Sequence, residues 1–130
     1  MSTVVIATSG SPASRRAARR AVEVFAGAEL VVATAVPGAP APAASPVRAA
    51  LDDLAVASAR RELSSTCEAL PVPVAAVLLR GDPVEVLCDA AAATSSDAIV
   101  VGSLGGTGGV AGELVRRAPC PVVELGSAAP

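Results

Sequence analysis

Histidine, lysine, tryptophan and tyrosine are all absent from the sequence, and its only aromatic residue is Phe25. Without histidine, lysine or tyrosine, the chain lacks the side chains that most often act as general bases or Schiff-base nucleophiles. A Ser-His-Asp triad cannot be assembled, and a Walker A phosphate loop lacks the lysine that it requires. We therefore predict no catalytic residues and no enzymatic activity.

Positive charge and cysteine are also scarce. The ten basic residues are all arginines, and twelve acidic residues give a net charge of −2. With neither a basic excess nor aromatic rings to stack on bases, we expect no nucleic-acid partner. The three cysteines are odd in number and lack CxxC spacing, so we expect no metal site or disulfide framework and predict a cytoplasmic location.

Long apolar runs are missing as well. None reaches the roughly 18 residues of a membrane span, and residues 1–10 lead directly into a strand pattern, so we expect neither a span nor a signal peptide. What the chain does contain is 52% hydrophobic residues, mostly small or branched aliphatic ones. A length of 130 residues fits a single domain spanning residues 1–130.

The aliphatic residues alternate between strand-like and helix-like segments. Each β-branched run is followed by a turn signal and then by apolar residues at helical spacing. This order predicts an α/β fold with a parallel sheet, right-handed crossovers and helices on both faces. The predicted strands are Thr3–Thr8, Glu29–Val36, Val72–Leu79, Ala98–Val101 and Cys120–Leu125, and the predicted helices begin at Pro12, Val47, Pro83 and Glu113.

Two segments carry more specific expectations. The long helix from Val47 to about Leu70 has apolar faces formed by Val47, Ala50, Leu51 and Leu54 and then by Leu63, Cys67 and Leu70. The strand Val72–Leu79 is apolar at nearly every position, as in strands that are covered on both faces. We also interpret the arginines of the first helix as a solvated face, Ser11 before Pro12 as the cap of that helix, and Asp82 and Glu85 as the cap of the third helix.

A glycine-rich loop follows the fourth strand, between Gly102 and Gly112. Glycines let backbone N–H groups approach a phosphate closely, so the loop suits an anion; tight turns between a strand and a short helix explain it equally well. Residues Gly106 to Ala111 fit the dinucleotide pattern G-x-G-x-x-A, but the following helix is too short for that fold. The ligands of such sheets bind beyond the carboxyl ends of the strands.

Four stretches resemble the universal stress protein family. They are Val4–Pro12, Gly81-Asp82-Pro83, Asp97–Ser103 and Val115–Val123. The resemblance implies a five-stranded sheet of order 3-2-1-4-5 and a homodimer paired through the last strand, Cys120–Leu125. It also implies a role in stress responses and, in members with the complete loop pattern, ATP binding, with Mg²⁺ present only if ATP binds.

The chain departs from the pattern of the ATP-binding members. Ser9 occupies the position of their acidic residue, and the pattern G-x2-G-x9-G-[ST] is shortened after Gly105. Two functions stay open: a weak adenine-nucleotide binder acting as a regulator, or a dimeric interaction module of the same fold without a nucleotide. The candidate ligand-binding residues are Ser9, Gly10, Val36, Gly102, Ser103, Gly105, Gly106, Gly108 and Gly109.

Overall fold

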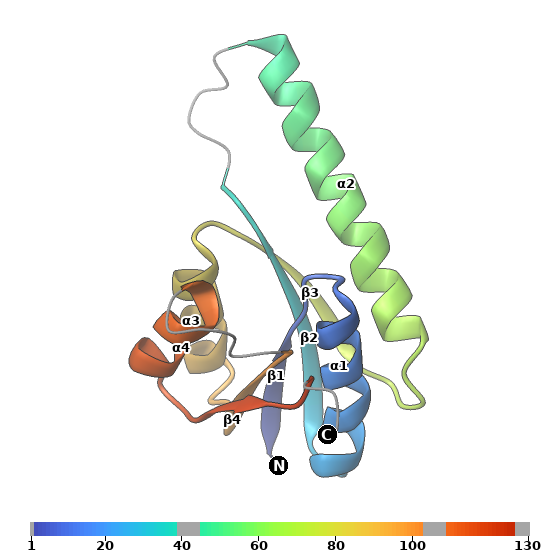
Figure 1. Ribbon diagram of the computed structural model, residues 1–130, viewed down its shortest axis with the longest axis vertical. Coiled ribbons are helices and arrows are strands. Elements are labelled where there is room, and N and C mark those ends of the chain that lie inside the picture. The colour runs from blue at the N-terminus through green and yellow to red at the C-terminus, as the bar shows by residue number, and fades with distance from the viewer. Residues whose placement is uncertain (1, 39–44, 103–108, 127–130) are drawn as a thin grey trace.

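The computed structural model describes residues 2–38, 45–102 and 109–126. Strands and helices alternate along the chain, as predicted (Figure 1). The strands are β1 (Thr3–Ala7), β2 (Glu29–Val36), β3 (Ala75–Arg80), β4 (Ala98–Val101) and β5 (Val122–Glu124). The helices are α1 (Pro12–Val24), α2 (Pro46–Glu68), α3 (Pro83–Ala93) and α4 (Gly109–Arg117).

The five strands form one parallel sheet of order β3-β2-β1-β4-β5. This confirms both the α/β architecture and the implied strand order. The order reverses at β1, which pairs with β2 on one side and with β4 on the other. In parallel sheets this reversal opens a crevice at the carboxyl ends of the two strands.

Apolar side chains of alternate strand residues build a core on each face of the sheet. Val4 and Ile6 of β1 pack with α1 and α2, whereas Val5 packs with α3 and α4. Figure 1 shows the same division, with α1 and α2 on one side of the sheet and α3 and α4 on the other. The predicted helices on both faces are therefore confirmed.

Three helices begin with the same local signal. Ser11, Ser45 and Asp82 each accept a hydrogen bond from a backbone N–H three residues later, and a proline occupies the first turn of each helix. The side chain of Asp82 accepts from the N–H of Glu85 at 3.1 Å, so the predicted cap is present. Such caps satisfy N–H groups that have no partner within the helix.

The third strand is covered on both faces, as predicted, but it is only partly buried: Leu78 packs against the core that contains Val4 and Ile6, whereas Val77 and Leu79 pack against the core that contains Val5. β3 begins at Ala75 rather than Val72, and its residues are half-buried or exposed. Its place explains the difference, because β3 lies at the edge of the sheet and pairs only with β2. An apolar run therefore does not distinguish an edge strand from a central one.

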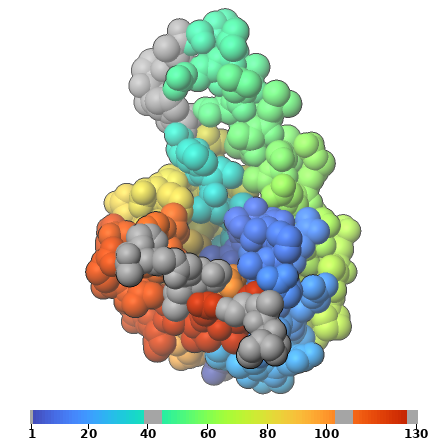
Figure 2. Space-filling view, viewed as in Figure 1, coloured from blue at the N-terminus to red at the C-terminus, as the bar shows by residue number. Residues whose placement is uncertain are grey.

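The amino-terminal part of α2 also differs from expectation. Val47, Leu51 and Leu54 are 70%, 61% and 64% exposed, whereas Leu63 on the same helix is buried. The helix is 23 residues long, and its first half extends beyond the sheet that it covers (Figures 1 and 2). These side chains consequently have no sheet to pack against.

The two last elements have other bounds than predicted. α4 begins at Gly109, four residues before Glu113, and β5 is confined to Val122–Glu124 within the predicted Cys120–Leu125. Among the helices of the described residues, none combines the length and apolar character that crossing a membrane requires.

Candidate functional site

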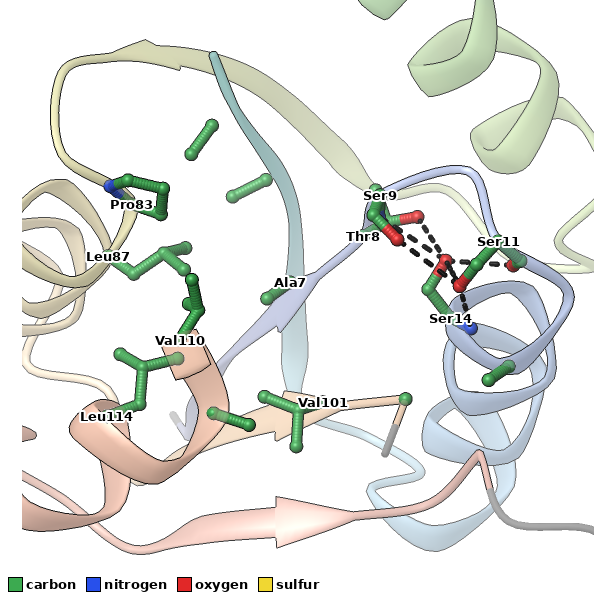
Figure 3. A pocket seen from close by; sticks show the side chains of 15 residues that line it. Ala7, Thr8, Ser9, Ser11, Ser14, Pro83, Leu87, Val101, Val110 and Leu114 are labelled. Atoms are coloured by element: carbon green, nitrogen blue, oxygen red, sulfur yellow. Dashed lines mark hydrogen bonds between the residues drawn. The ribbon is translucent and has the colours of Figure 1, made fainter. Parts of the chain in front are cut away.

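A pocket of about 380 Å³ opens where the strand order reverses (Figure 3). Its floor is formed by the carboxyl ends of the central strands, through Ala7 of β1, Ala33 and Ala35 of β2, and Val101 of β4. Small-molecule sites occupy about 300–1,000 Å³ and occur at such crevices. The fold thus places a pocket of ligand size at the position expected for this sheet.

One wall of the pocket consists of hydroxyl groups at the turn between β1 and α1. The Ser14 hydroxyl is at its centre: it accepts from the Thr8 hydroxyl at 3.1 Å and from the Ser9 N–H at 3.3 Å. It donates to the Ser11 carbonyl at 2.9 Å, and the Ser11 hydroxyl lies 3.2 Å from it. These contacts connect Thr8, Ser9, Ser11 and Ser14 in a hydroxyl cluster (Figure 3).

The sequence explains why this cluster forms. Ser11 caps α1, and Ser14 follows it by three residues, so both face the end of β1. Ser14 heads the buried stripe of α1, which continues through Ala17, Ala18 and Ala21. A buried hydroxyl is costly unless it is hydrogen-bonded, and the turn provides Ser14 with the partners.

The opposite wall is apolar. Pro83 and Leu87 of α3 and Val110 and Leu114 of α4 face the pocket across from the hydroxyl cluster (Figure 3). Among the described lining residues, none carries a charge. The described part of the pocket therefore combines an aliphatic surface, which suits a flat, apolar group, with hydroxyls that can hydrogen-bond a polar group.

Gly102 lines the pocket and is also the point at which the end of β4 packs against the backbone of α1. A Cβ on Gly102 would lie 2.7 Å from the backbone nitrogen of Ser14 and 2.9 Å from the carbonyl carbon of Ala13. Real Cβ atoms do not approach backbone atoms so closely. The first turn of α1 can thus pack against the end of β4 only because residue 102 has no side chain.

The predicted ligand-binding residues do not all meet at this pocket. Ser9 and Gly102 line it. Gly10, Val36 and Gly109 do not: Gly10 faces a separate depression, Val36 accepts a hydrogen bond from the Gly81 N–H, and Gly109 begins α4. Ser103, Gly105, Gly106 and Gly108 lie outside the described residues.

Several lining residues were not predicted. Thr8 was assigned to the strand, Ser11 to a cap, and Pro83 and Leu87 to a helix, without a binding role. Only Ser14 could have been recognised from the sequence. A serine at the head of an otherwise apolar helical stripe indicates a buried hydroxyl with a specific partner. The aliphatic residues carry no such signal, since core packing explains them equally well.

The three cysteines are free thiols and lie outside the pocket lining. Burial raises the pKa of Cys67, Cys88 and Cys120, and the neighbouring thiol of Cys88 raises the pKa of Cys120 further. A raised pKa disfavours the thiolate, which is the reactive form. Within the described residues, no group of three metal-ligating side chains occurs.

Comparison with known proteins places the chain in a family. Residues 1–124 match the model of the universal stress protein family. A universal stress protein from Burkholderia pseudomallei is 28% identical, with a TM-score of 0.77 over 97% of this chain and 96% of that chain. No curated protein matches the sequence.

Two further solved structures are bound to nucleotides. A universal stress protein in complex with cAMP is 26% identical, with a TM-score of 0.62 over 95% of each chain. A family protein from Arabidopsis thaliana with AMP bound is 21% identical and shares the fold, with a TM-score of 0.70 over 96% of this chain and 91% of that chain. Together with the family model, the sheet order and the pocket at β1 and β4, these similarities show that the chain belongs to the universal stress protein family.

Proposed function

We propose that the protein is a regulatory module of the stress response that binds an adenine nucleotide weakly in the pocket at β1 and β4. The observation that carries this proposal is the pairing of one aliphatic wall with one hydroxyl wall in a cavity of about 380 Å³. The complex of a 26% identical family member with cAMP supports the choice of ligand.

The two walls suit the two halves of a nucleoside. The purine ring would lie against Leu87 and the alanines of β2, because its faces are apolar. The ribose hydroxyls would meet Thr8, Ser9 and Ser11, which both donate and accept hydrogen bonds. The phosphates would then extend toward Gly102 at the end of β4.

Ser9 sets the expected strength of binding. A hydrogen bond to a charged acceptor contributes about 1.5–3 kcal/mol, against about 0.5–1.5 kcal/mol for a neutral one. Replacing the carboxylate of the ATP-binding pattern by a hydroxyl therefore weakens binding by roughly 10-fold. We propose accordingly that affinity is low, that Mg²⁺ enters only with ATP, and that the chain does not hydrolyse ATP.

Restoring the carboxylate tests the proposal. Ser9 is exposed, so Ser9→Asp should fold normally and should tighten the binding of AMP and cAMP about 10-fold by calorimetry. Ser58→Asp adds the same charge to an exposed position of α2 and should leave affinity unchanged. If neither the wild type nor Ser9→Asp shows binding heat or a melting shift with millimolar nucleotide, nucleotide binding is refuted. The function is then that of a dimeric interaction module that binds no nucleotide.

We also propose a cytoplasmic homodimer that pairs through the last strand. β5 pairs with β4 and forms one edge of the sheet, and the three free thiols suit a reducing compartment. Pro121 and Leu125 hydrogen-bond to β4, so by alternation the N–H of Val122 points away from the sheet, and Val122→Pro would remove it from this edge. Sedimentation should then show a monomer in place of a dimer, whereas an unchanged dimer would place the interface elsewhere.

A further inference from the structure

A second depression, of about 370 Å³, lies on the other side of the β1–α1 turn. It is lined by Gly10, Pro12, Arg15, Arg16 and Arg19, and we call it the arginine hollow. Successive residues of the turn face different sites: Ser9 and Ser11 line the pocket, whereas Gly10 and Pro12 line the hollow. The hollow is therefore next to the pocket but shares none of its lining residues.

The three arginines of the hollow have no carboxylate partner in the described part of the chain. The ion pairs found there are Arg80–Asp52 and Arg116–Glu113. Arg16 is held in place by a hydrogen bond from its Nε to the carbonyl of Gly126, at 3.0 Å. Its charge thus remains directed at the hollow without being neutralised.

Few negative charges surround this site. The carboxylate of Glu62 from α2 lies beside Gly10, and it is not within ion-pair distance of the arginines. Arg15 and Arg19 otherwise face Ser65 and Thr66 of α2, which are neutral. Residues 1–28 as a whole contain four arginines and one acidic residue, Glu23, in a protein whose net charge is −2.

We propose that the arginine hollow binds a chain of two or more phosphoryl groups. Guanidinium groups match phosphate oxygens with paired N–H donors, and they bind them more specifically than ammonium groups do. Arg15 and Arg19 lie one helical turn apart, about 6 Å between their Cβ atoms, and Arg16 lies between them in the sequence. A linear polyphosphate spans such a row and relieves the repulsion between its charges, which a monovalent anion does not.

This proposal is independent of nucleotide binding in the pocket, because the hollow recognises only the phosphate chain. The chain could be free, or it could be the triphosphate of a nucleotide. Inorganic tripolyphosphate, which has no base or sugar, tests binding of the phosphate chain without the nucleoside, and the arginine variants assign that binding to the hollow. AMP, which has a single phosphate, probes the pocket alone.

The experiment measures the binding of sodium tripolyphosphate by calorimetry at constant ionic strength. The double substitution Arg15→Gln/Arg19→Gln should weaken binding at least tenfold. The control, Arg60→Gln/Arg61→Gln, removes the same charge from exposed positions of α2 that do not line the hollow, and it should leave affinity unchanged. Equal losses in both variants, or no binding by the wild type, would overturn the proposal.

Two further measurements complete the test. Circular dichroism of both variants without ligand should show equal melting temperatures, since all four arginines are exposed. If the hollow takes the phosphates of a nucleotide, the double substitution will weaken ATP but not AMP; if it takes a free polyphosphate, both nucleotides will bind as before while tripolyphosphate does not. If the wild type does not bind AMP, nucleotide binding in the pocket is refuted, but phosphate binding in the hollow is not.

Discussion

Gly102 offers the sharpest test of how the site is built, because two roles of this residue predict different results. If Gly102 serves only to bring N–H groups to a phosphate, then Gly102→Ala affects ligand binding alone. The structure instead places the missing Cβ against the backbone of α1, 2.7 Å from the nitrogen of Ser14. Backbone atoms in a helix cannot move aside as the end of a side chain can. We therefore expect Gly102→Ala to destabilise the protein in the absence of any ligand.

The size of the effect follows from the contact. Forcing an extra methyl group into a packed site costs about 1–3 kcal/mol. The entropy of unfolding is about 2.1 cal/mol/K per residue, or about 0.27 kcal/mol/K for a chain of this length. The melting temperature of Gly102→Ala should thus fall by roughly 4–11 °C.

The assay is thermal unfolding followed by circular dichroism, with Gly38→Ala as the matched control. A Cβ on Gly38 would lie 3.5 Å from the nearest atom, the Cα of Gly81, which is an ordinary contact. Its melting temperature should stay within about 2 °C of the wild type, equivalent to about 0.5 kcal/mol. A Gly102→Ala variant that is as stable as Gly38→Ala would refute the packing role.

Three further outcomes follow from burial, capping and titration. Leu63→Ala should cost about 2–5 kcal/mol in urea unfolding, whereas Leu51→Ala on the exposed part of the same helix should stay within about 0.5 kcal/mol. Asp82→Ala should cost about 1 kcal/mol through loss of the α3 cap, and Asp82→Asn should retain most of it. Folding raises the pKa of Cys120, so the folded protein holds that thiol proton more tightly than the unfolded chain does. The free energy of unfolding should therefore decline as the pH rises past 9.0, the ordinary pKa of the thiol, and Cys120→Ser should reduce that decline.

The fold could be predicted from the sequence because its signals are local and agree with one another. Ser11-Pro12 and Asp82-Pro83 each mark a helix start that the structure confirms. The alternation of strands and helices then leaves little choice of topology. The order of the strands came from the resemblance to a family, since alternation alone does not say which strand lies at the edge.

The failures have a common physical cause. The apolar residues of β3 and of the first half of α2 were expected to be buried, and many of them are exposed. Hydrophobic patterning reports which side chains could pack, but it does not report whether a sheet reaches far enough to cover them. The same limit applies to the pocket, where Leu87 and Leu114 are at once core residues and lining residues.

One short turn determines the chemistry of both proposed sites. Ser9 faces the pocket, and the next residue, Gly10, faces the hollow, so a charge at position 9 acts on both. A carboxylate there would strengthen the hold on a ribose, but it would also lie near the three arginines and lower their attraction for phosphate. The neutral serine has the opposite balance: it binds a nucleoside more weakly, and it adds no negative charge to that of Glu62, whose carboxylate already lies beside Gly10. The departure from the ATP-binding pattern at Ser9 therefore shifts the preference of this surface from the nucleoside toward the phosphate chain.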